Sequence, residues 1–393
     1  MAVSIHYYSS LQGTGYGDAA AAYIDGLLQY GVEIKWAPLV WTPVGLKPYL
    51  YIPERFRPSL DRSTRRSRKL IELMYTDVDP EVLFLHVMPE LYQSFTETDK
   101  PKIGYTVWET TQLPKHWPSL VRHVDQLIVP CQFNQPLFSV EGGPPVAVIP
   151  HIADTSLAVK DTAAAEQFRR RWQIEPSTLV FYNISSWHPR KAIWDTLHTY
   201  LLAFTHNDDV CFILKTDQLG YDYSNTRNHL KQPTRDMVEQ IIAAYPDPAR
   251  VILIDESVPQ NEIRALHAGA DCYFSLSHSE GWGMGAFNAG AAGNAVVITG
   301  WGGQLDFLDT ESAYLVDYKL ITVAEFSGFE SYTRDQSWAS ADVEHGISLL
   351  NRVFHDQEEA RDKAHRLQKS ILEKYTSDVV TKNLVEVIDS VRT

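Results

Sequence analysis

The first half of the chain alternates short apolar runs with longer segments in which apolar residues recur at helical spacing. Runs rich in β-branched and aromatic residues predict buried strands, and the amphipathic segments between them predict helices. Strands that alternate with helices indicate βαβ units and a parallel sheet. The predicted strands are Val3–Tyr8, Val32–Trp36, Val82–His86, Ile103–Val107, Gln126–Val129 and Val146–Ile149, and the first predicted helix is Asp18–Tyr30.

The pattern resets around Pro150 to Asp161 and then starts again, which predicts a second α/β unit. We therefore expect an N-terminal domain of residues 1–155, a C-terminal domain of residues 156–372 and a last helical segment of residues 373–393. Two doubly wound, Rossmann-like domains would leave a cleft, and ligands bind at strand ends that face such a cleft. The second half predicts strands Leu179–Ile184, Val210–Lys215, Val251–Asp255, Cys272–Leu276 and Ala295–Thr299, and helices Ala192–Phe204, Thr234–Ala244, Gln260–Gly269, Phe287–Ala292 and Ser377–Val391.

Length, charge and cysteine content narrow the class of protein. A chain of 393 residues is long enough for two domains with separate cores, and a net charge of -14 argues against general nucleic-acid binding. Cys131, Cys211 and Cys272 lack metal-ligand spacing and are interpreted as buried free thiols, which suits a reducing cytoplasm. The N-terminal residues lack the features of a signal peptide, and no apolar run reaches transmembrane length, so we expect a cytoplasmic protein.

Candidate chemistry is concentrated in residues 278–308, where Glu280 precedes a glycine-rich turn and a helix of small residues. Glycines let a ligand approach the backbone, and a helix N-terminus offers free N–H groups and partial positive charge. A carboxylate beside such an anion site suits sugar hydroxyls or a cationic transition state. The combination predicts an activated sugar, in which a polyhydroxyl ring is joined to a diphosphate. Capping of the helix by Glu280 is the alternative.

Three cations are candidates for holding the diphosphate. Arg190 and Lys191 lie at a predicted helix start, where the helix dipole favours acids, and a bound diphosphate would explain both positive charges there. A solvated surface pair is the alternative. Lys215, at the end of a predicted strand, allows the same two interpretations.

Polar and glycine residues also follow strands of the N-terminal half. His86 ends one predicted strand and Glu109 follows the next, so one of them is expected to position the substrate or to exchange a proton with it. A structural role is the alternative for His86. Gly13, Gly15 and Gly17 form a predicted turn after the first strand, which either presents N–H groups to a phosphate or is a plain tight turn.

Two charged clusters have weaker functional interpretations. Asp77 and Asp79 form an Asp-x-Asp pattern that metal sites use, but the following Pro80 favours a simple turn. A basic run suits a solvated loop or a contact with an anionic acceptor or a membrane. Its members are Arg62, Arg65, Arg66, Arg68 and Lys69.

Together these segments resemble the retaining, nucleotide-sugar-dependent GT-B glycosyltransferases of the large family with an E-x7-E motif. The resemblance covers nearly the whole chain and implies the GT-B fold, in which two Rossmann-like domains face each other across a cleft. It rests on Asn183 with Arg190-Lys191, on residues 258–271, on Ser279–Gly283 and Gly302-Gly303, and on residues 108–114, 129–134 and 150–154.

The resemblance implies roles for the matching residues. The family's arginine–lysine pair, here Arg190 and Lys191, holds the donor diphosphate, and its first motif glutamate, here Glu280, contacts the donor sugar. The second motif glutamate bonds the ribose, but this chain has Asn288 there, and an amide bonds hydroxyls more weakly than a carboxylate. The family's acceptor-side histidine is matched by His86 or Glu109. The predicted donor site also includes Gly13, Gly15, Gly17, Lys215, Trp282, Gly283, Met284 and Gly285.

The predicted function is that of a retaining glycosyltransferase of glycan or polysaccharide biosynthesis. It would move a sugar from a UDP- or GDP-type donor to a hydroxyl of a glycan or lipid-linked saccharide. The C-terminal domain would bind the donor, the N-terminal domain the acceptor, and the last helix would pack back on the N-terminal domain. No metal or other cofactor and no nucleic-acid partner is expected, and peripheral contact with the inner face of a membrane stays open.

Three other classes of function also stay open. A metal-dependent GT-A-type transferase would use Asp77 and Asp79. A nucleotide-sugar epimerase can share the GT-B shape. A non-catalytic GT-B scaffold subunit is suggested by Asn288, which stands where the family has a glutamate.

Overall fold

The protein folds into two α/β units, each with its own sheet. The computed structural model describes residues 3–11, 15–42, 45–58, 60, 64–95, 99–221, 231–323 and 331–392. Unit 1 comprises Met1–Trp108, Leu113–Ile152 and Lys374–Thr393, and unit 2 comprises Glu109–Gln112 and Ala153–Glu373. The four residues Glu109–Gln112 therefore belong to unit 2, although they follow a strand of unit 1.

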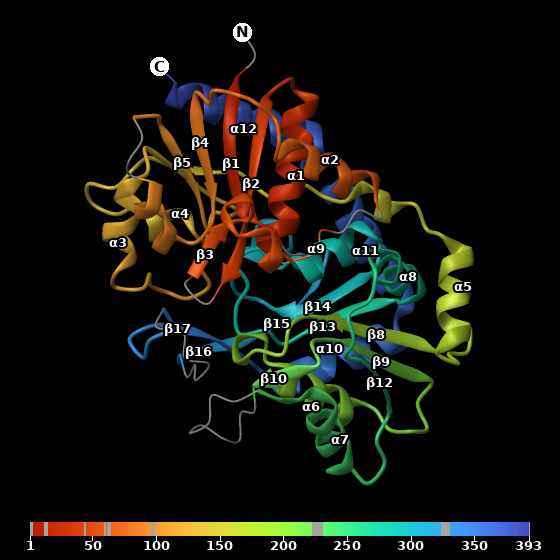
Figure 1. Ribbon diagram of the computed structural model, residues 1–393. Coiled ribbons are helices and arrows are strands. Elements are labelled where there is room, and N and C mark those ends of the chain that lie inside the picture. Colours follow the sequence, from red (N-terminus) through yellow and green to blue (C-terminus); the bar gives the residue numbers. More distant parts are fainter. Residues whose placement is uncertain are drawn as a thin grey trace. The chain divides into compact units, whose positions relative to one another are not determined.

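Unit 1 is built on a seven-stranded sheet of order β3-β2-β1-β4-β5-β6-β7 (Figure 1). Neighbouring strands pair in parallel except β2 and β3, which form an antiparallel hairpin. Strand β4 is buried at every position, as expected for a central strand of a parallel sheet. The strands are β1 (Ser4–Ser10), β2 (Glu33–Thr42), β3 (Gly45–Pro48), β4 (Val82–His86), β5 (Lys102–Tyr105), β6 (Gln126–Val129) and β7 (Val146–Val148).

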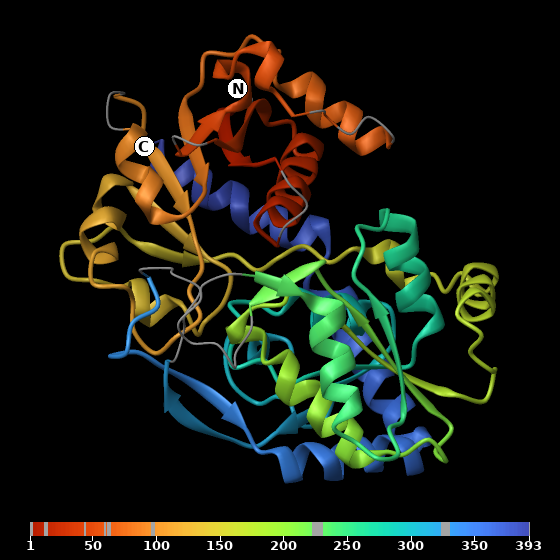
Figure 2. The ribbon, with the colours of Figure 1, turned by 60° about the horizontal axis from the view of Figure 1, so that its bottom comes forward.

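Helices from both ends of the chain cover unit 1. The C-terminal helix α12 (Ser377–Val391) lies beside α1 (Gly15–Gln29), as Figures 1 and 2 show. The absence of a side chain at Gly26 allows this contact, because a Cβ there would collide with Thr381. Val380, Leu384 and Ile388 of α12 complete the unit 1 core. The other helices are α2 (Arg65–Leu73), α3 (Trp117–Leu120) and α4 (Gln135–Phe138).

Two expectations for unit 1 are wrong. Helix α1 begins at Gly15, so Gly15 and Gly17 lie in its first turn rather than in a loop, while Gly13 lies outside the described residues. The basic run forms helix α2 instead of a solvated loop. Thr64 caps this helix by accepting a hydrogen bond from the Ser67 backbone N–H. Of the basic run, Arg62 lies outside the described residues.

Unit 2 is built on a six-stranded parallel sheet of order β12-β9-β8-β13-β14-β15. The strand order reverses between β8 and β13, which are neighbours in the sheet but far apart in the sequence. The strands are β8 (Leu179–Ile184), β9 (Val210–Lys215), β12 (Arg250–Ile254), β13 (Cys272–Ser275), β14 (Ala295–Thr299) and β15 (Tyr314–Val316).

Helices cover both faces of the unit 2 sheet. In Figure 1, α8, α9 and α11 lie on one face and α6, α7 and α10 on the other. The helices are α5 (Thr162–Arg171), α6 (Ile193–Ala203), α7 (Thr234–Ala243), α8 (Gln260–Gly269), α9 (Met284–Ala291), α10 (Val343–His355) and α11 (Gln357–Lys374).

Two antiparallel pairs lie outside the unit 2 sheet, and Figure 2 shows the second of them in blue. The first pair is β10 (Leu219–Tyr221) with β11 (Lys231–Pro233). The second is β16 (Tyr318–Thr322) with β17 (Ser337–Ala341). The apolar pattern of the sequence predicted neither pair.

Candidate active site

The point where the strand order of unit 2 reverses positions the main candidates. In open α/β sheets, ligands bind beyond the C-terminal strand ends at such a point. Here the two strands that flank it are β8 and β13. The segment after β8 carries Arg190 and Lys191, and the segment after β13 carries Glu280. The topology therefore brings together side chains that are far apart in the sequence.

Arg190, Lys191 and Glu280 form one ion-paired cluster. Lys191 Nζ donates to both carboxylate oxygens of Glu280, at 2.7 Å each. Arg190 Nη1 donates to Glu280 Oε2 at 3.4 Å and to the carbonyl oxygen of Ser279 at 2.5 Å. The exposed fractions of the three side chains are 14% for Arg190, 18% for Lys191 and 11% for Glu280. The alternative of a solvated surface pair for Arg190 and Lys191 is therefore wrong.

Glu109 adds a second carboxylate to this cluster. Its Oε1 lies 3.3 Å from Arg190 Nη2, and its Oε2 accepts a hydrogen bond from the Tyr332 hydroxyl at 3.0 Å. Two hydrogen bonds between Thr111 and Ser337 fix the segment Glu109–Gln112 to the start of β17. The formal charges of Arg190, Lys191, Glu109 and Glu280 add up to zero.

Burial and ion pairing act in opposite directions on the pKa values of the cluster. Burial would raise the pKa of Glu280, but Lys191 and Arg190 outweigh it and hold that pKa below its ordinary value. Burial lowers the pKa of Lys191 against the opposing effect of Glu280. Burial also disfavours the charged form of Arg190, yet Glu109, Tyr332 and Glu280 raise its pKa overall. Glu280 and Arg190 are therefore ionised at neutral pH.

A strained turn presents the two cations. Residues Pro189–Lys191 form a single 3-10 turn, and Ala192 after them has φ 45° and ψ 44°. A non-glycine residue in this left-handed conformation costs on the order of 1–3 kcal/mol, so surrounding contacts must hold it. The Arg190 carbonyl oxygen supplies two of these contacts, since it accepts hydrogen bonds from His278 N at 2.8 Å and from Ser277 Oγ at 3.3 Å.

Two glycine turns hold the backbone of Glu280. Gly283 has φ +89° and precedes the first turn of α9, where free N–H groups point out of the helix. Gly302 has φ +114°, and a Cβ there would lie 2.9 Å from the Glu280 carbonyl oxygen. The backbone N–H of Gly303 donates to that same oxygen at 2.8 Å. Both turns therefore require glycine, as expected where a backbone approaches another backbone closely.

The remaining residues of the glycine stretch lie on or beside α9. The indole of Trp282 is buried against Phe287 and Phe307, so Trp282 can offer a ligand only its backbone. Met284 is the first residue of α9, and Gly285 makes room for the ring of Tyr273.

Asn288 is half-buried on α9, and its side chain makes no hydrogen bond to any described residue. The alternative, a hydrogen bond from this side chain to the local backbone, is therefore absent among the described residues. Lys215 ends β9, where its Nζ donates to the Thr216 carbonyl oxygen at 2.9 Å, outside the ion-paired cluster. Burial lowers the pKa of Lys215, and nearby acids oppose this effect.

His86 lies inside the core of unit 1. Its Nδ1 shares a 2.7 Å hydrogen bond with the Tyr7 hydroxyl, and its ring centroid is 3.8 Å from that of Tyr105. The side chain is fully buried, and burial together with His151 holds the pKa of His86 well below its ordinary value. A neutral, enclosed imidazole suits packing better than direct contact with a substrate, so the substrate role of His86 stays a prediction that its burial disfavours.

The Asp-x-Asp pattern lies in an exposed turn. Asp79 is 89% exposed at its side chain and pairs with Lys100 at 3.3 Å. Within the described ranges, no group of three or more His, Cys, Asp or Glu side chains is arranged to hold a metal ion. No helix of the described residues is long and apolar enough to cross a membrane.

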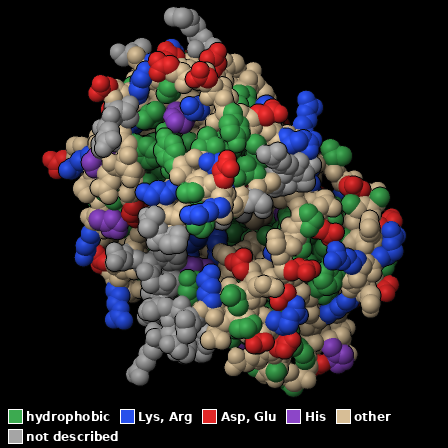
Figure 3. Space-filling model, viewed as in Figure 1, with side chains coloured by type: hydrophobic (Ala, Val, Ile, Leu, Met, Phe, Trp, Pro, Cys, Tyr) green, Lys and Arg blue, Asp and Glu red, His purple; other side chains and the backbone are tan. Residues whose placement is uncertain are grey.

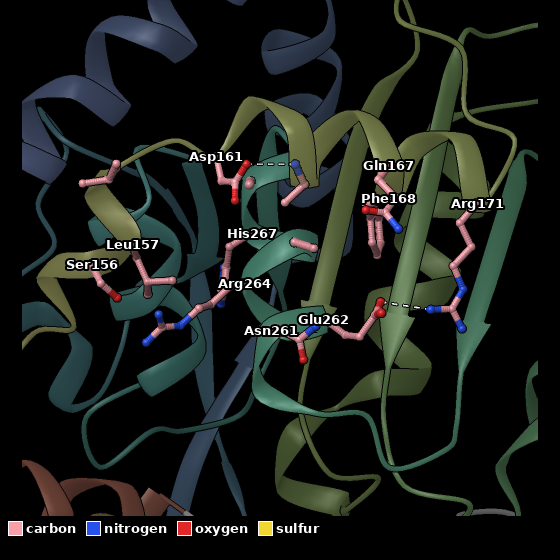
Figure 4. A pocket seen from close by; sticks show the side chains of 14 residues that line it. Ser156, Leu157, Asp161, Gln167, Phe168, Arg171, Asn261, Glu262, Arg264 and His267 are labelled. Atoms are coloured by element: carbon pink, nitrogen blue, oxygen red, sulfur yellow. Dashed lines mark hydrogen bonds and ion pairs between the residues drawn. The ribbon is translucent and has the colours of Figure 1, made fainter. Parts of the chain in front are cut away.

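Figure 4 shows a cavity of about 720 Å³ in unit 2, whose lining includes no member of the ion-paired cluster. It is lined by α5, α8 and the 3-10 turn Thr155–Ala158. Its charged side chains already have partners, because Arg171 pairs with Glu262 and Arg264 pairs with Asp154. The cluster around Glu280 is the better candidate site, because it follows the two strands between which the strand order reverses.

Three residues of the site were not anticipated from the sequence. Gln304 is fully buried, and its Nε2 donates to the carbonyl oxygens of Thr299 and Trp301, which shapes the second glycine turn. Tyr332 donates a hydrogen bond to the Glu109 carboxylate. The backbone N–H of His278 donates to the Arg190 carbonyl oxygen. Gln304 follows Gly302-Gly303 directly, which is a usable signal, whereas no motif surrounds Tyr332.

Comparison with known proteins agrees with this architecture. Residues 219–324 match the family model described as "Glycosyl transferases group 1", and the match includes Glu280 and both glycine turns. A glycosyltransferase from Rickettsia africae superposes with a TM-score of 0.69 at 11% sequence identity, over 99% of this chain and 98% of that chain. The protein has the GT-B fold. The GT-A-type alternative is therefore wrong at the level of the fold.

Two further structures have the same GT-B architecture. HepE from Anabaena, in complex with UDP and glucose, has a TM-score of 0.67 at 14% identity, over 99% of this chain and 100% of that chain. Sucrose-phosphate synthase from Thermosynechococcus elongatus has a TM-score of 0.67 at 13% identity, over 99% of this chain and 98% of that chain. No curated protein matches the chain by sequence. The predicted resemblance to GT-B glycosyltransferases is confirmed, while the E-x7-E detail stays a prediction.

Proposed function

We propose that this GT-B protein is a retaining glycosyltransferase that moves a sugar from a UDP- or GDP-type donor to a hydroxyl of a glycan or lipid-linked saccharide. The observation that carries the proposal is the convergence of Arg190, Lys191 and Glu280 beyond the ends of β8 and β13. A diphosphate needs cations, and a sugar needs an acceptor for its hydroxyls. The complex of HepE with UDP and glucose supports a nucleotide-sugar donor for this fold.

The diphosphate would take Arg190 and Lys191 as partners. Both cations are now neutralised by carboxylates, so the donor must share or replace part of this pairing. Lys191 supplies a compact charge and Arg190 a planar fork. Arg190 Nε has no hydrogen-bond partner among the described residues, so this side chain has a donor to spare. The free N–H groups of the first turn of α9 add further positive potential.

Glu280 would then face the sugar. When the bond between the anomeric carbon and the phosphate oxygen breaks, positive charge develops on the ring, and a fixed carboxylate stabilises it. The acceptor oxygen bonds to the anomeric carbon on the face that the phosphate leaves. The acceptor proton passes to the departing phosphate oxygen, so no enzyme base is required.

Arg190 and Lys191 would supply the positive charge that other transferases take from a metal ion. We therefore expect transfer to continue in the presence of EDTA. Loss of transfer in EDTA and its recovery with manganese would contradict this part of the proposal.

A thermal-shift screen with UDP-, GDP- and ADP-sugars tests the donor assignment. A ligand at about 100 times its Kd stabilises the folded state by about 2.7 kcal/mol, which raises the melting temperature measurably. We expect a shift with a UDP- or GDP-sugar, followed by transfer or slow donor hydrolysis detected by mass spectrometry. Absence of any shift would favour a non-catalytic scaffold, and an isomerised donor without acceptor would favour an epimerase.

A surface of unit 1 supports peripheral contact with an anionic membrane, where a lipid-linked acceptor would lie. Trp41, Tyr51 and Phe56 are 64%, 81% and 65% exposed. The sequence from Trp41 to Lys69 holds eight Lys and Arg against two acids, in a chain of net charge -14. Figure 3 shows blue and green side chains over the region of α2 and β3. Exposed aromatics among cations suit a lipid headgroup layer.

Vesicle cosedimentation tests this contact. The cytoplasmic location is a separate prediction that this experiment does not address. We expect the protein to sediment with vesicles that contain anionic lipid and not with purely zwitterionic ones. Trp41→Ala combined with Phe56→Ala should abolish the difference. Equal recovery from both kinds of vesicle would contradict the proposal.

A further inference from the structure

The hairpin formed by β16 and β17, with residues 331–336 that lead into β17, is connected to Arg190 in two ways, each through one intervening residue. The first runs through the backbone. Ala339 of β17 donates its N–H to the His278 carbonyl oxygen at 3.0 Å, and His278 in turn donates its own N–H to the Arg190 carbonyl oxygen at 2.8 Å. One residue therefore separates the hairpin from the backbone of Arg190.

His278 is held rigidly in this connection. Its Nδ1 lies 2.7 Å from the Ala339 carbonyl oxygen, and because a carbonyl only accepts, Nδ1 must carry the proton. The imidazole ring stacks on Trp338, with ring centroids 4.9 Å apart and planes 17° apart. Burial lowers the pKa of His278, against the opposing effects of Asp195 and Ala339. The geometry fixes one tautomer of the ring.

The second connection runs through side chains. Tyr332 donates its hydroxyl hydrogen to Glu109 Oε2 at 3.0 Å, and Glu109 Oε1 lies 3.3 Å from Arg190 Nη2. The turn that carries Tyr332 is itself ordered by buried Gln336, whose Nε2 donates to the Ser331 carbonyl oxygen at 2.9 Å. The hairpin thus holds both ends of Arg190, its backbone and its guanidinium.

We propose that Tyr332 is a positioning residue for Arg190, acts through Glu109, and thereby sets how firmly the protein holds the donor diphosphate. The inference rests on the proposed function. Nη1 of Arg190 is fixed by Ser279 and Glu280, so the pairing of Nη2 with Glu109 defines the plane of the guanidinium. Without the Tyr332 hydroxyl, Glu109 keeps its ion pair with Arg190 but loses the hydrogen bond to its other oxygen, so the plane of the guanidinium is less firmly fixed. Among the described residues, Lys191 pairs with Glu280 alone and has no partner in the hairpin.

Kinetics of Tyr332→Phe test this role. Tyr332 supports Arg190 equally before and during transfer, so its loss should weaken donor binding more than the chemical step. We expect the donor KM to rise about tenfold, the size of one lost hydrogen bond to a charged group, with kcat within about twofold. Tyr318→Phe is the matched control, since Tyr318 lies on the same hairpin and its hydroxyl bonds to no described residue.

A double-mutant cycle with Glu109→Gln shows whether Tyr332 acts through Glu109. We expect Tyr332→Phe to add nothing once Glu109→Gln is present. A full additional tenfold effect in that background, or an unchanged KM in the single variant, would overturn the inference.

Calorimetric titration of UDP and GDP into the wild-type protein separates this inference from the proposed function. Wild-type binding that is unchanged in Tyr332→Phe would overturn the positioning role alone. No binding of either nucleotide by the wild type would overturn the donor assignment and the inference with it. Binding that weakens about tenfold in Tyr332→Phe, and not in Tyr318→Phe, is the expected result.

Discussion

At the scale of single residues, the site is a set of buried charges whose free energies depend on one another. Glu280 compensates Lys191 and Arg190, so the cost of burying each charge is offset only while the others are present. Such a cluster has a fixed geometry that a donor can use, and it is sensitive to the loss of any member. Glu280 therefore affects both activity and stability. Only a substitution of Glu280 paired with one of its cations can distinguish the proposed sugar contact from the role in folding.

Glu280→Gln should lower both activity and stability. The variant leaves Lys191 without its carboxylate, and breaking a buried ion pair costs about 3–5 kcal/mol. Loss of the fixed charge near the anomeric carbon should lower kcat by about 10²–10³-fold. The double variant Glu280→Gln with Lys191→Met should recover much of the stability, measured by chemical denaturation, and none of the activity. Recovery of activity would contradict the catalytic assignment.

Acidification should destabilise the protein through its buried histidines. Burial lowers the pKa of His267 from 6.5 to about 4 and that of His151 to about 3. The unfolded chain binds protons below about pH 6.5 and the folded protein does not, so this stability is complete above pH 6.5 and is lost as the pH falls toward 4 for His267 and toward 3 for His151. His267→Gln should reduce the loss by about 3 kcal/mol. Denaturant titrations at several pH values, with exposed His365→Gln as the control, measure the difference.

At the scale of elements, short turns rather than helices or strands hold the functional groups. Arg190 lies in a 3-10 turn that ends at left-handed Ala192, and the Glu280 backbone is held between Gly283 and Gly302. The rigid strands β8 and β13 determine where these turns start. This arrangement suits a site whose charges must rearrange slightly when a donor binds, because a turn adjusts more easily than a strand within a sheet.

Gly302→Ala should lower donor turnover by more than the strain of a positive φ would by itself. The new Cβ would lie 2.8 Å from Gln304 Oε1 and 2.9 Å from the Glu280 carbonyl oxygen, so the Glu280 backbone must shift. Gly31→Ala is the matched control, because Gly31 also has a positive φ of +78° but a Cβ there meets no atom within 4 Å. Both variants should lose about 1–3 kcal/mol to strain. Only Gly302→Ala should also reduce donor turnover, and equal turnover in both variants would refute the constraint on Glu280.

At the scale of the whole molecule, the chain builds unit 1 from both of its ends. Helix α12 is the last element of the sequence, yet its apolar face belongs to the core formed by the first strands and helix. Unit 1 is therefore incomplete until the C-terminal segment has been added. Unit 2 in turn takes Glu109–Gln112 from a stretch of sequence that otherwise belongs to unit 1.

Leu384→Ala should destabilise unit 1 selectively. Leu384 is fully buried in its core, and truncation of a buried leucine costs about 2–5 kcal/mol. Val379→Ala on the same helix is the control, since Val379 is 42% exposed. Calorimetry with limited proteolysis should show earlier cleavage within unit 1 and an unchanged unit 2. Equal destabilisation of both units would show that they unfold together.

The regular elements were predictable because their signal is local. The hydrophobic pattern gave the observed bounds of β4, β6, β8, β9, α8 and α12. It missed the β16–β17 hairpin, because its strand β16 is largely exposed and lacks an apolar run. It also missed the helical form of α2, which buries no residue fully and depends on the Thr64 cap.

The sequence by itself determined the two α/β units, the glycine turns at Gly283 and Gly302, and the residue types on which the proposed nucleotide-sugar site rests. Only the tertiary structure decided that Arg190 and Lys191 are buried partners of Glu280, that Glu109 joins them, and that His86 is enclosed in a core. The physical reason is the sequence separation of the residues that interact. Secondary structure follows from residues a few positions apart, whereas burial and ion pairing depend on strand order, which brings together charges from distant parts of the chain.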